Sequence, residues 1–473
     1  MTDDQRKLSY RKQANGSTYV YEVLDHYWDK EKQQARTKQV YLGKLDPQTG
    51  ELIPKKSLGD QAAAALNPAV TARTTISGPA LLLKQIDRSI GLSRELKKSS
   101  PEHWREILTL AWYCLATGSA LSHAEVWCQN HEVPSERRLS SQRISELLDA
   151  ISEDERQRFF AGWGQSIVSR DYLCYDITSV SSYAEQNEYV RYGYNRDGEK
   201  LPQINLGLVY GQQSMLPVTY RHLPGSIHDV STLEQLLDQF KKLGFSRLHL
   251  VMDRGFYSEA NVDRMAEAGH NFTIGVPIKL KWVREIIDAD RDLVDGTAGY
   301  HKHNGEVVYA HTRLLSWGKS KRRCYLHLYF DADRMTRDRV AFDEELAQYR
   351  EELLTEQPVA EHEDSYARFF ICKRTPKRGL RVEFNWEAVT AARKQYVGFS
   401  AILSTKFKDP LQALDVYREK DVVEKCFDDL KNGLDLKRLR VHQSRRMQSR
   451  LFVQFIALIL QSAIRQVIKT RLP

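Results

Sequence analysis

The segment Leu248–Ser258, with the sequence LHLVMDRGFYS, decides the fold prediction for this chain. Leu248–Met252 is a short apolar run typical of a buried strand, and Asp253 follows it directly. Helical spacing then begins near Ser258 and continues to Ala268. A strand, an acidic turn and a helix in this order predict a strand–helix–strand unit, with the second strand at Asn271–Val276.

Three further apolar runs precede this unit, at Tyr172–Ile177, Asn205–Tyr210 and Leu216–Tyr220. The turn sequence Gly211–Ser214 joins the last two, as expected for an antiparallel hairpin. A helix is expected at Val230–Leu243, before the segment quoted first. Hairpin strands followed by a strand–helix–strand unit predict an α/β fold with a mixed sheet flanked by helices.

The rest of the pattern divides the chain into further parts. Residues 1–60 alternate apolar and polar positions and predict a small N-terminal β unit. Residues 61–169 have helical spacing, which fits a helix-turn-helix DNA-binding domain or an ordinary helical bundle, with Ser140 or Ser141 as a helix cap. The sheet-bearing core is expected at 170–278 and 406–473, with a β-rich insertion domain at 279–405.

Charge and cysteine content narrow the function classes. The chain has 70 Lys and Arg against 62 Asp and Glu, a net charge of +8, which mildly favours a polyanionic partner. Its six cysteines form no CxxC pair, which argues against a zinc knuckle or a disulfide framework and fits a reducing cytosol. The polar first residues predict no signal peptide. Gln454, Gln461 and Arg465 favour a buried or amphipathic helix over a membrane span at Leu451–Ile468.

Two aspartates are expected at the ends of predicted strands. Asp176 follows the apolar run Tyr172–Tyr175, and Asp253 follows Leu248–Met252. Neighbouring strand ends in an α/β sheet are where ligands bind. Carboxylate oxygens are the ligands that Mg²⁺ prefers, and two such ions activate a water or a 3′-hydroxyl for phosphoryl transfer. Either aspartate alone is more often structural than catalytic, because Asp is common in turns.

A third carboxylate, Glu424, lies in a segment with helical spacing. Tyr417, Lys420, Glu424 and Lys431 are separated by three, four and seven residues, so a single helix would carry them along one stripe. A neighbouring apolar face is expected to dock on the sheet; it comprises Val422, Val423, Phe427 and Leu430. A carboxylate flanked by cations suits the binding of a metal ion together with a phosphate.

These motifs resemble those of the bacterial insertion-sequence transposases of the insertion-sequence-four superfamily. The third motif of that family is Tyr-x2-Arg-x3-Glu-x6-Lys, which this chain matches at Tyr417, Glu424 and Lys431. Lys420 takes the arginine position, which keeps the charge but loses the bidentate fork. The family's Asp-x-Gly-Phe is complete at residues 253–256, and the likeness extends over most of the chain.

The resemblance implies an RNase H-like catalytic core split by the insertion domain, in a DDE transposase of the cut-and-paste type. Such an enzyme cuts and joins double-stranded DNA at terminal inverted repeats by 3′-hydroxyl strand transfer, through hairpin ends. Asp176, Asp253 and Glu424 would then be the catalytic residues and would hold two Mg²⁺ ions, for which Mn²⁺ substitutes. A homodimer that holds both element ends and a bacterial cytoplasmic, nucleoid-associated location are expected.

The resemblance also implies DNA contacts. By family analogy, Tyr417 contacts a displaced end base or its phosphate, Lys431 contacts the terminal phosphate, and Trp282 or Trp317 receives a flipped base. The remaining DNA-binding candidates are the cations Lys420, Arg254, Arg438 and Arg440. The last two belong to a basic run, Lys437–Arg450, which we interpret as phosphate-binding, with a solvated helix face as the alternative. For Trp282 and Trp317, packing is the commoner role of this residue type and is the alternative to base binding. His222 and His228 are expected on a loop near the site.

Two other functions are compatible with the sequence. One is a metal-dependent nuclease or resolvase built on the same core. The other is a non-catalytic DNA-binding protein descended from a transposase. The intact set of carboxylates disfavours this last function, because a pure DNA binder has no need of them.

Overall fold

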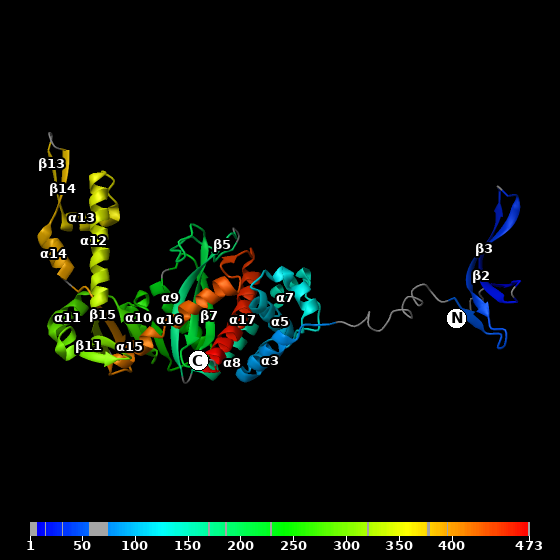
Figure 1. Ribbon diagram of the computed structural model, residues 1–473, viewed down its shortest axis with the longest axis horizontal. Helices are drawn as coiled ribbons and strands as arrows, with labels where there is room; N and C mark the ends of the chain where they lie inside the picture. Colours follow the sequence, from blue (N-terminus) through cyan, green and yellow to red (C-terminus); the bar gives the residue numbers. More distant parts are fainter. Residues whose placement is uncertain are drawn as a thin grey trace. The chain divides into compact units, whose positions relative to one another are not determined.

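A computed structural model describes residues 7–14, 16–30, 32–55, 74–168, 171–184, 187–227, 229–318, 321–375, 379–394 and 396–471. His228 lies outside these residues. The chain forms two compact units, residues 1–74 and 75–473 (Figure 1).

The first unit is a four-stranded antiparallel sheet in sequence order, β1 (Leu8–Lys12), β2 (Thr18–Asp29), β3 (Gln34–Leu45) and β4 (Leu52–Pro54). Its strands alternate apolar and polar residues, and the rings of Tyr19 and Tyr21 pack on Tyr41 at centroid distances of 5.4 and 5.3 Å. Among the described residues of this unit, Val20 is the one fully buried apolar side chain. Its core is therefore small.

The second unit begins with helices α3 (Gly78–Ile90), α4 (Leu92–Ser99), α5 (Trp104–Thr117), α6 (Ala124–Asn130), α7 (Ser141–Ala150) and α8 (Glu153–Val168), with a 3-10 turn at Leu121–His123. Ser140 caps α7, because its side chain accepts a hydrogen bond from the Arg143 N–H at 3.2 Å. The last helix, α17 (Ser444–Arg471), contacts α3, α5 and α7 and also strand β7 (Leu216–Pro224). Helices from both ends of this unit therefore share one core.

A ten-stranded sheet follows, and it confirms the predicted mixed α/β fold. Its strands run in the order β10-β11-β12-β15-β9-β8-β5-β6-β7, with the short β16 (Arg438–Leu439) pairing beside β5. The central strands β5 (Tyr172–Ser182), β8 (His249–Met252) and β9 (Asn271–Val276) are parallel, whereas β5, β6 (Gln203–Gly211) and β7 are antiparallel neighbours. The connecting helices are α9 (Asp229–Lys242) and α10 (Glu259–Glu267).

Residues 279–405, expected as a β-rich insertion domain, are divided between this sheet and a helical lobe. Strands β10 (Tyr300–His303), β11 (Glu306–Trp317) and β12 (Arg322–Phe330) extend the main sheet through β15 (Phe399–Ser404), beside α11 (Lys281–Val294) and a 3-10 turn at Thr297–Gly299. The lobe comprises α12 (Ala332–Leu354), a 3-10 turn at Ala360–His362, α13 (Glu363–Phe369), the hairpin β13 (Phe370–Thr375) and β14 (Gly379–Phe384), and α14 (Trp386–Lys394). It stands out from the sheet and has its own small core around Leu346, Phe369 and Val389 (Figure 1).

Helix α17 is long and apolar enough to span a membrane by composition, but 67% of its apolar window is buried inside the protein. It is the central core helix of the second unit. The ring of Phe452 lies 5.3 Å from Phe159 of α8, and Phe455 lies 5.1 Å from Tyr220 of β7. Burial against other elements therefore accounts for its apolar character.

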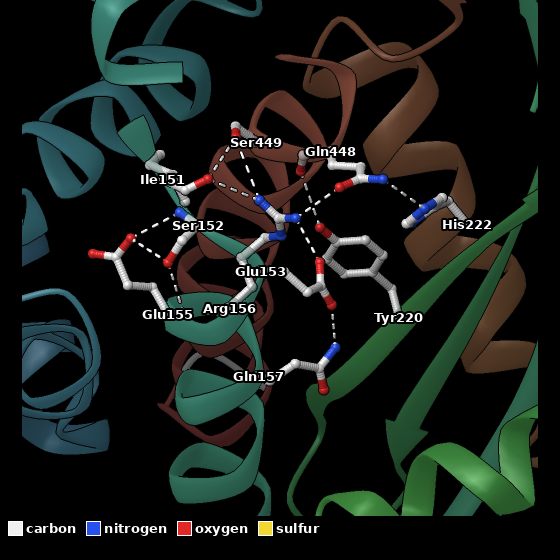
Figure 2. Close-up of polar contacts among 10 residues, drawn as sticks. All are labelled: Ile151, Ser152, Glu153, Glu155, Arg156, Gln157, Tyr220, His222, Gln448 and Ser449. Atoms are coloured by element: carbon white, nitrogen blue, oxygen red, sulfur yellow. Dashed lines mark hydrogen bonds and ion pairs between the residues drawn. The ribbon is translucent and has the colours of Figure 1, made fainter. Parts of the chain in front are cut away.

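A buried arginine joins α8 to α17 (Figure 2). The guanidinium of Arg156 donates to the Ile151 carbonyl at 3.1 Å, to Glu153 at 2.5 Å and to the Gln448 side chain at 2.7 Å. Gln448 in turn contacts the ring of His222 at 3.2 Å. His222 therefore lies on strand β7 in this network and not on a loop at the predicted site, and burial lowers its pKa to about 4.

Candidate active site

Asp176 lies in the middle of strand β5 and not at its end, because β5 continues through Ile177 to Ser182. The continuation pairs with β6 and, at Ser181, with β16. The side chain of Asp176 is half-buried and accepts a hydrogen bond from the Ile177 N–H at 2.7 Å. Burial raises the pKa of this carboxyl to about 6, which means that the fold disfavours its anionic form.

Asp253 follows strand β8 directly, as predicted, and lies beside Asp176. In the parallel pairing of β5 with β8, Tyr175 is opposite Met252, so the two aspartates come next on adjacent strands. The hydroxyl of Tyr417 donates to the Asp253 carboxylate at 2.6 Å. Burial works to raise the pKa of Asp253, but this hydrogen bond and the nearby Lys420 charge outweigh it and lower the pKa.

The segment that carries Glu424 is not one helix. It divides into α15 (Pro410–Arg418), α16 (Asp421–Asp428) and a π-helical turn at Asp429–Gly433. At the first junction the backbone tightens, because the Lys420 N–H bonds to the Tyr417 carbonyl and the Val423 N–H to the Lys420 carbonyl. The predicted single stripe is therefore wrong, since Tyr417 and Glu424 belong to different helices.

Because the helix breaks here, the part of the motif with Tyr417 and the part with Glu424 have different surroundings. Val423, Cys426 and Phe427 bury one face of α16, and Glu424 is exposed on the other. Lys420 lies at the junction with its ammonium 5.4 Å from the Tyr417 ring centre. Burial works to lower the pKa of Lys420, but the carboxylates of Asp253, Asp421 and Glu424 raise it, so the lysine is held as a cation.

The structure brings the three predicted carboxylates to one cavity. A cavity of about 540 Å³ is lined by Asp176, Asp253 and Glu424, together with Arg196, Asp229 and Lys431. Within the described part of the chain, no three His, Cys, Asp or Glu side chains form a group that could hold a single metal ion. The arrangement thus offers carboxylates around a shared space rather than one preformed three-ligand cage.

The carboxylate chemistry suits a hard divalent cation. Mg²⁺ keeps several waters and takes one or two protein carboxylates together with substrate phosphates, so it does not require three side chains on one ion. A cation bound at this cavity would favour the anionic form of Asp176, which burial disfavours. The residues present therefore fit such ions.

Several predicted DNA-binding cations already have acidic partners. Lys431 pairs with both carboxylate oxygens of Asp197 at 2.8 and 2.7 Å, and Arg438 pairs with Glu199 at 2.9 Å. Within the basic run, Arg446 pairs with Asp149 and Arg450 with Asp435, so part of this run stabilises the fold. Arg440 is exposed.

A second, larger cavity is also lined by Asp253. It has a volume of about 930 Å³ and is lined by Asp253, Arg254, Lys420, Tyr417, Arg418 and Arg334 among others. The close approach of Tyr417 to this wall depends on Gly275, because a Cβ there would lie 2.4 Å from the Tyr417 hydroxyl oxygen. This cavity is thus lined by Asp253 and by three of the predicted DNA-binding residues, Arg254, Lys420 and Tyr417.

Trp282 and Trp317 pack on each other, with ring centroids 5.7 Å apart in an edge-on arrangement. The Trp317 indole also donates to Asp263 at 2.9 Å. Neither ring is among the residues that line the cavity of the three carboxylates. These contacts agree with a packing role for both tryptophans, which is the alternative to base binding.

Sequence reasoning missed the ion pair between Arg196 and Asp229. The Arg196 guanidinium donates to both Asp229 oxygens at 2.7 and 2.6 Å, and both residues line the cavity of Asp176. Arg196 lies in the connection between β5 and β6, where no periodicity marks it. The one signal in the sequence is that a basic residue lies in the connection that follows the strand of Asp176.

The family match decides the identity of this fold. Residues 169–460 match the transposase DDE domain, a span that contains all three carboxylates of the cavity. The chain belongs to the DDE transposase family. Members of this family cut and join DNA, and divalent metal ions are their general requirement.

Two solved structures to which this transposase is similar are themselves structures of transposases. The piggyBac transposase synaptic complex with hairpin DNA is 7% identical, with a TM-score of 0.38, over 87% of this chain and 71% of that one. The Drosophila P element transposase strand transfer complex is 10% identical, with a TM-score of 0.18, over 77% and 80%. No curated protein matches the transposase.

Proposed function

We propose that this transposase cuts and joins DNA at the terminal inverted repeats of an insertion sequence, with Asp176, Asp253 and Glu424 as its catalytic residues. The observation that carries the proposal is the convergence of these carboxylates, distant in sequence, on one cavity. All three lie within residues 169–460, which match the transposase DDE domain. Excision through hairpin ends and 3′-hydroxyl strand transfer belong to this proposal, as does membership of the insertion-sequence-four superfamily.

The strand order supports an RNase H-like core. The strand order β7-β6-β5-β8-β9, with an antiparallel hairpin followed by parallel strands, places Asp176 on β5 and Asp253 directly after the adjacent strand β8. The helical lobe and strands β10–β12 then form the insertion between β9 and β15. Glu424 comes after this insertion, on a helix that covers the sheet.

We propose Mg²⁺ as the ion, two per active site, with Mn²⁺ as a substitute. Asp176, Asp253 and Glu424 are the residues that would hold these ions. When bound, such ions supply the positive charge that activates a water or 3′-hydroxyl and stabilises the leaving oxygen. Tyr417 holds the Asp253 carboxylate in place by its hydrogen bond. Lys420 and Arg254 supply positive charge at the adjoining cavity, where phosphates of double-stranded DNA would lie.

The test uses labelled terminal inverted repeats incubated with the full chain and Mg²⁺. Hairpin ends and joined products support transposition; plain nicks would indicate a nuclease or resolvase, and binding without cleavage a non-catalytic DNA-binding protein. Replacing Asp176, Asp253 or Glu424 by Ala should abolish cleavage and leave DNA binding largely intact. Asp238→Ala, an exposed carboxylate on α9, is the matched control and should cleave normally. Substantial cleavage by any of the three variants would remove that residue from the site.

A dimer that holds both ends in a bacterial cytoplasmic, nucleoid-associated setting completes the proposal. Mass measurement of the DNA complex by light scattering tests the dimer: two chains and two DNA ends are expected. A complex with one chain and one end would rule out the paired arrangement.

A further inference from the structure

Two tyrosines in the connection between β5 and β6 are unusually exposed. Tyr194 is 81% exposed and Tyr192 is 73% exposed, more than any other large apolar side chain among the described residues. They lie in the RYGYNR segment, Arg191–Arg196, where the rings alternate with glycine and are flanked by arginines. Two large exposed rings side by side in one segment point to a binding partner.

The exposure does not come from a loosely held backbone. Arg191 and Gln203 exchange two backbone hydrogen bonds of 2.9 Å, and the Gln203 side chain donates to the Tyr194 carbonyl at 2.9 Å. The Arg196 N–H donates to the Ser179 hydroxyl of β5 at 2.7 Å. The RYGYNR segment is therefore fixed to the sheet at both ends, and the rings are held outward.

A glycine between the tyrosines brings the segment close to a second loop. A Cβ at Gly193 would lie 2.0 Å from the carbonyl oxygen of Gly225, so no larger residue fits there. The approach creates a hollow of about 320 Å³ beside the rings, lined by Tyr192, Tyr194, Arg196 and Asp229 among others. Arg196 and Asp229 also line the cavity of the three carboxylates, so the hollow adjoins that cavity.

The charge of the RYGYNR segment suits a polyanion. Arg191 and Lys200 are exposed before and after the rings, and the Arg196 guanidinium is paired with Asp229. The acidic residues that come between, Asp197 and Glu199, are already paired with Lys431 and Arg438. Aromatic rings interleaved with cations on a rigid support are typical of surfaces that stack unpaired nucleobases while neighbouring cations contact the phosphates.

We propose that Tyr192 and Tyr194 stack on unpaired bases of the DNA strand that enters the carboxylate cavity. A paired duplex presents phosphates and base edges, and the faces of its bases are covered by their neighbours. Only a strand that has opened next to the cut site offers ring faces to these tyrosines. The inference rests on the proposed function, because the strand reaches the rings through the same cavity.

The experiment measures binding of the full chain, in metal-free buffer so that no cleavage occurs. One probe is a fully paired duplex, and the other has the same duplex with four unpaired nucleotides, one of them 2-aminopurine. Tyr192→Ala and Tyr194→Ala should each weaken binding of the unpaired probe about tenfold, and leave the paired probe nearly unchanged. Tyr192→Phe and Tyr194→Phe should bind both probes normally and keep the quenching of 2-aminopurine, because stacking needs the ring and not the hydroxyl.

The control is Tyr300→Ala, which removes an exposed tyrosine of strand β10 and should change neither probe. Equal losses on both probes would mean a phosphate or groove contact and would overturn the proposal. Normal binding by the Ala variants would also overturn it and leave the rings as a protein-binding surface. Cleavage by the wild-type chain in Mg²⁺ is scored separately. A chain that stacks unpaired bases but does not cut would refute the proposed function alone, and a chain that cuts but does not stack would refute only this inference.

Discussion

At the scale of single residues, Asp176 is placed where its charge opposes stability. Burial raises its pKa to about 6, so the folded protein holds this proton more tightly than the unfolded chain does. Below about pH 4 both states are protonated and the effect vanishes. Between about pH 4 and pH 6 the unfolded chain has lost its proton while the folded protein still holds it, so the metal-free fold loses stability across this range and no further above it.

We therefore predict that Asp176→Asn stabilises the metal-free protein at pH 7 by about 3 kcal/mol while abolishing cleavage. The gain should shrink to under about 1 kcal/mol near pH 4, because the wild-type carboxyl is then neutral as well. Urea unfolding at both pH values measures this difference. Mg²⁺ should raise the unfolding midpoint of the wild type more than that of the variant. An Asn variant less stable than the wild type at pH 7 would contradict the argument.

Tyr417 gives a second prediction at this scale. Its hydroxyl donates to Asp253 in the DNA-free protein, which differs from the DNA contact that the family resemblance implies. Tyr417→Phe removes one hydrogen bond to a charged group, worth about 1.5–3 kcal/mol, so cleavage should slow about tenfold to a hundredfold. DNA affinity measured by gel shift should stay within about twofold of the wild type, because Asp253 rather than the DNA has lost a partner. A large loss of affinity with normal cleavage at saturating DNA would instead support direct contact.

At the scale of elements, the connection between β5 and β6 places acidic side chains on the predicted phosphate-binding cations. Asp197 forms an ion pair with Lys431, and Glu199 forms one with Arg438. DNA that binds these cations has to displace the carboxylates first. The connection therefore lowers the affinity of the DNA-free protein for phosphate, and it also keeps the two cations oriented.

Asp197→Asn should release Lys431 and strengthen DNA binding about two- to fivefold, since ion pairs of this exposure are worth at most about 1 kcal/mol. The slope of log affinity against log salt should steepen by about one unit, because one more cation becomes available to the DNA. Fluorescence anisotropy at several salt concentrations measures both. Asp343→Asn, which breaks the exposed pair with Arg393 on the helical lobe, is the matched control and should change neither value. Weaker binding by Asp197→Asn would show that orientation of Lys431 matters more than its release.

At the scale of the whole molecule, helices from opposite ends of the second unit pack against each other and against strand β7 of the sheet. The guanidinium of Arg156 connects α8, α17 and the Ile151 carbonyl, and Tyr220 of β7 donates to the Gln448 backbone at 3.3 Å (Figure 2). Arg156 is only 4% exposed. Its loss would remove the donor to the Gln448 side-chain oxygen and one of the donors to the Ile151 carbonyl and to the Glu153 carboxylate.

Arg156→Met should lower the free energy of unfolding by about 3 kcal/mol, because the partners of a buried charge remain in place without it. Arg158→Met is the control: this exposed neighbour donates a single bond to the Ser99 carbonyl, and its loss should cost less than about 1 kcal/mol. Urea denaturation of both variants gives the comparison. Equal effects would mean that the contacts of Arg156 contribute no more than those of a surface arginine.

Local patterns determined a large part of the fold in advance. Apolar runs of strand length and the turn at residues 211–214 predicted the hairpin β6–β7, and the segment 248–276 predicted β8, α10 and β9. These features depend on contacts within a few residues, so periodicity reveals them. Asp176, Asp253 and Glu424 were likewise visible as carboxylates in strand and helix contexts, and Ser140 as a cap.

Only the tertiary structure decided how these residues are used. Strand β5 continues past Asp176 because β6 and β16 pair with it, and the helix breaks at Lys420, where Tyr417 bonds to Asp253 across 164 positions. The pairing of Lys431 with Asp197 and the outward rings of Tyr192 and Tyr194 also depend on neighbours remote in the chain. Hydrogen bonds and ion pairs of this kind leave no periodic trace, because their partners are set by how the elements pack and not by local spacing.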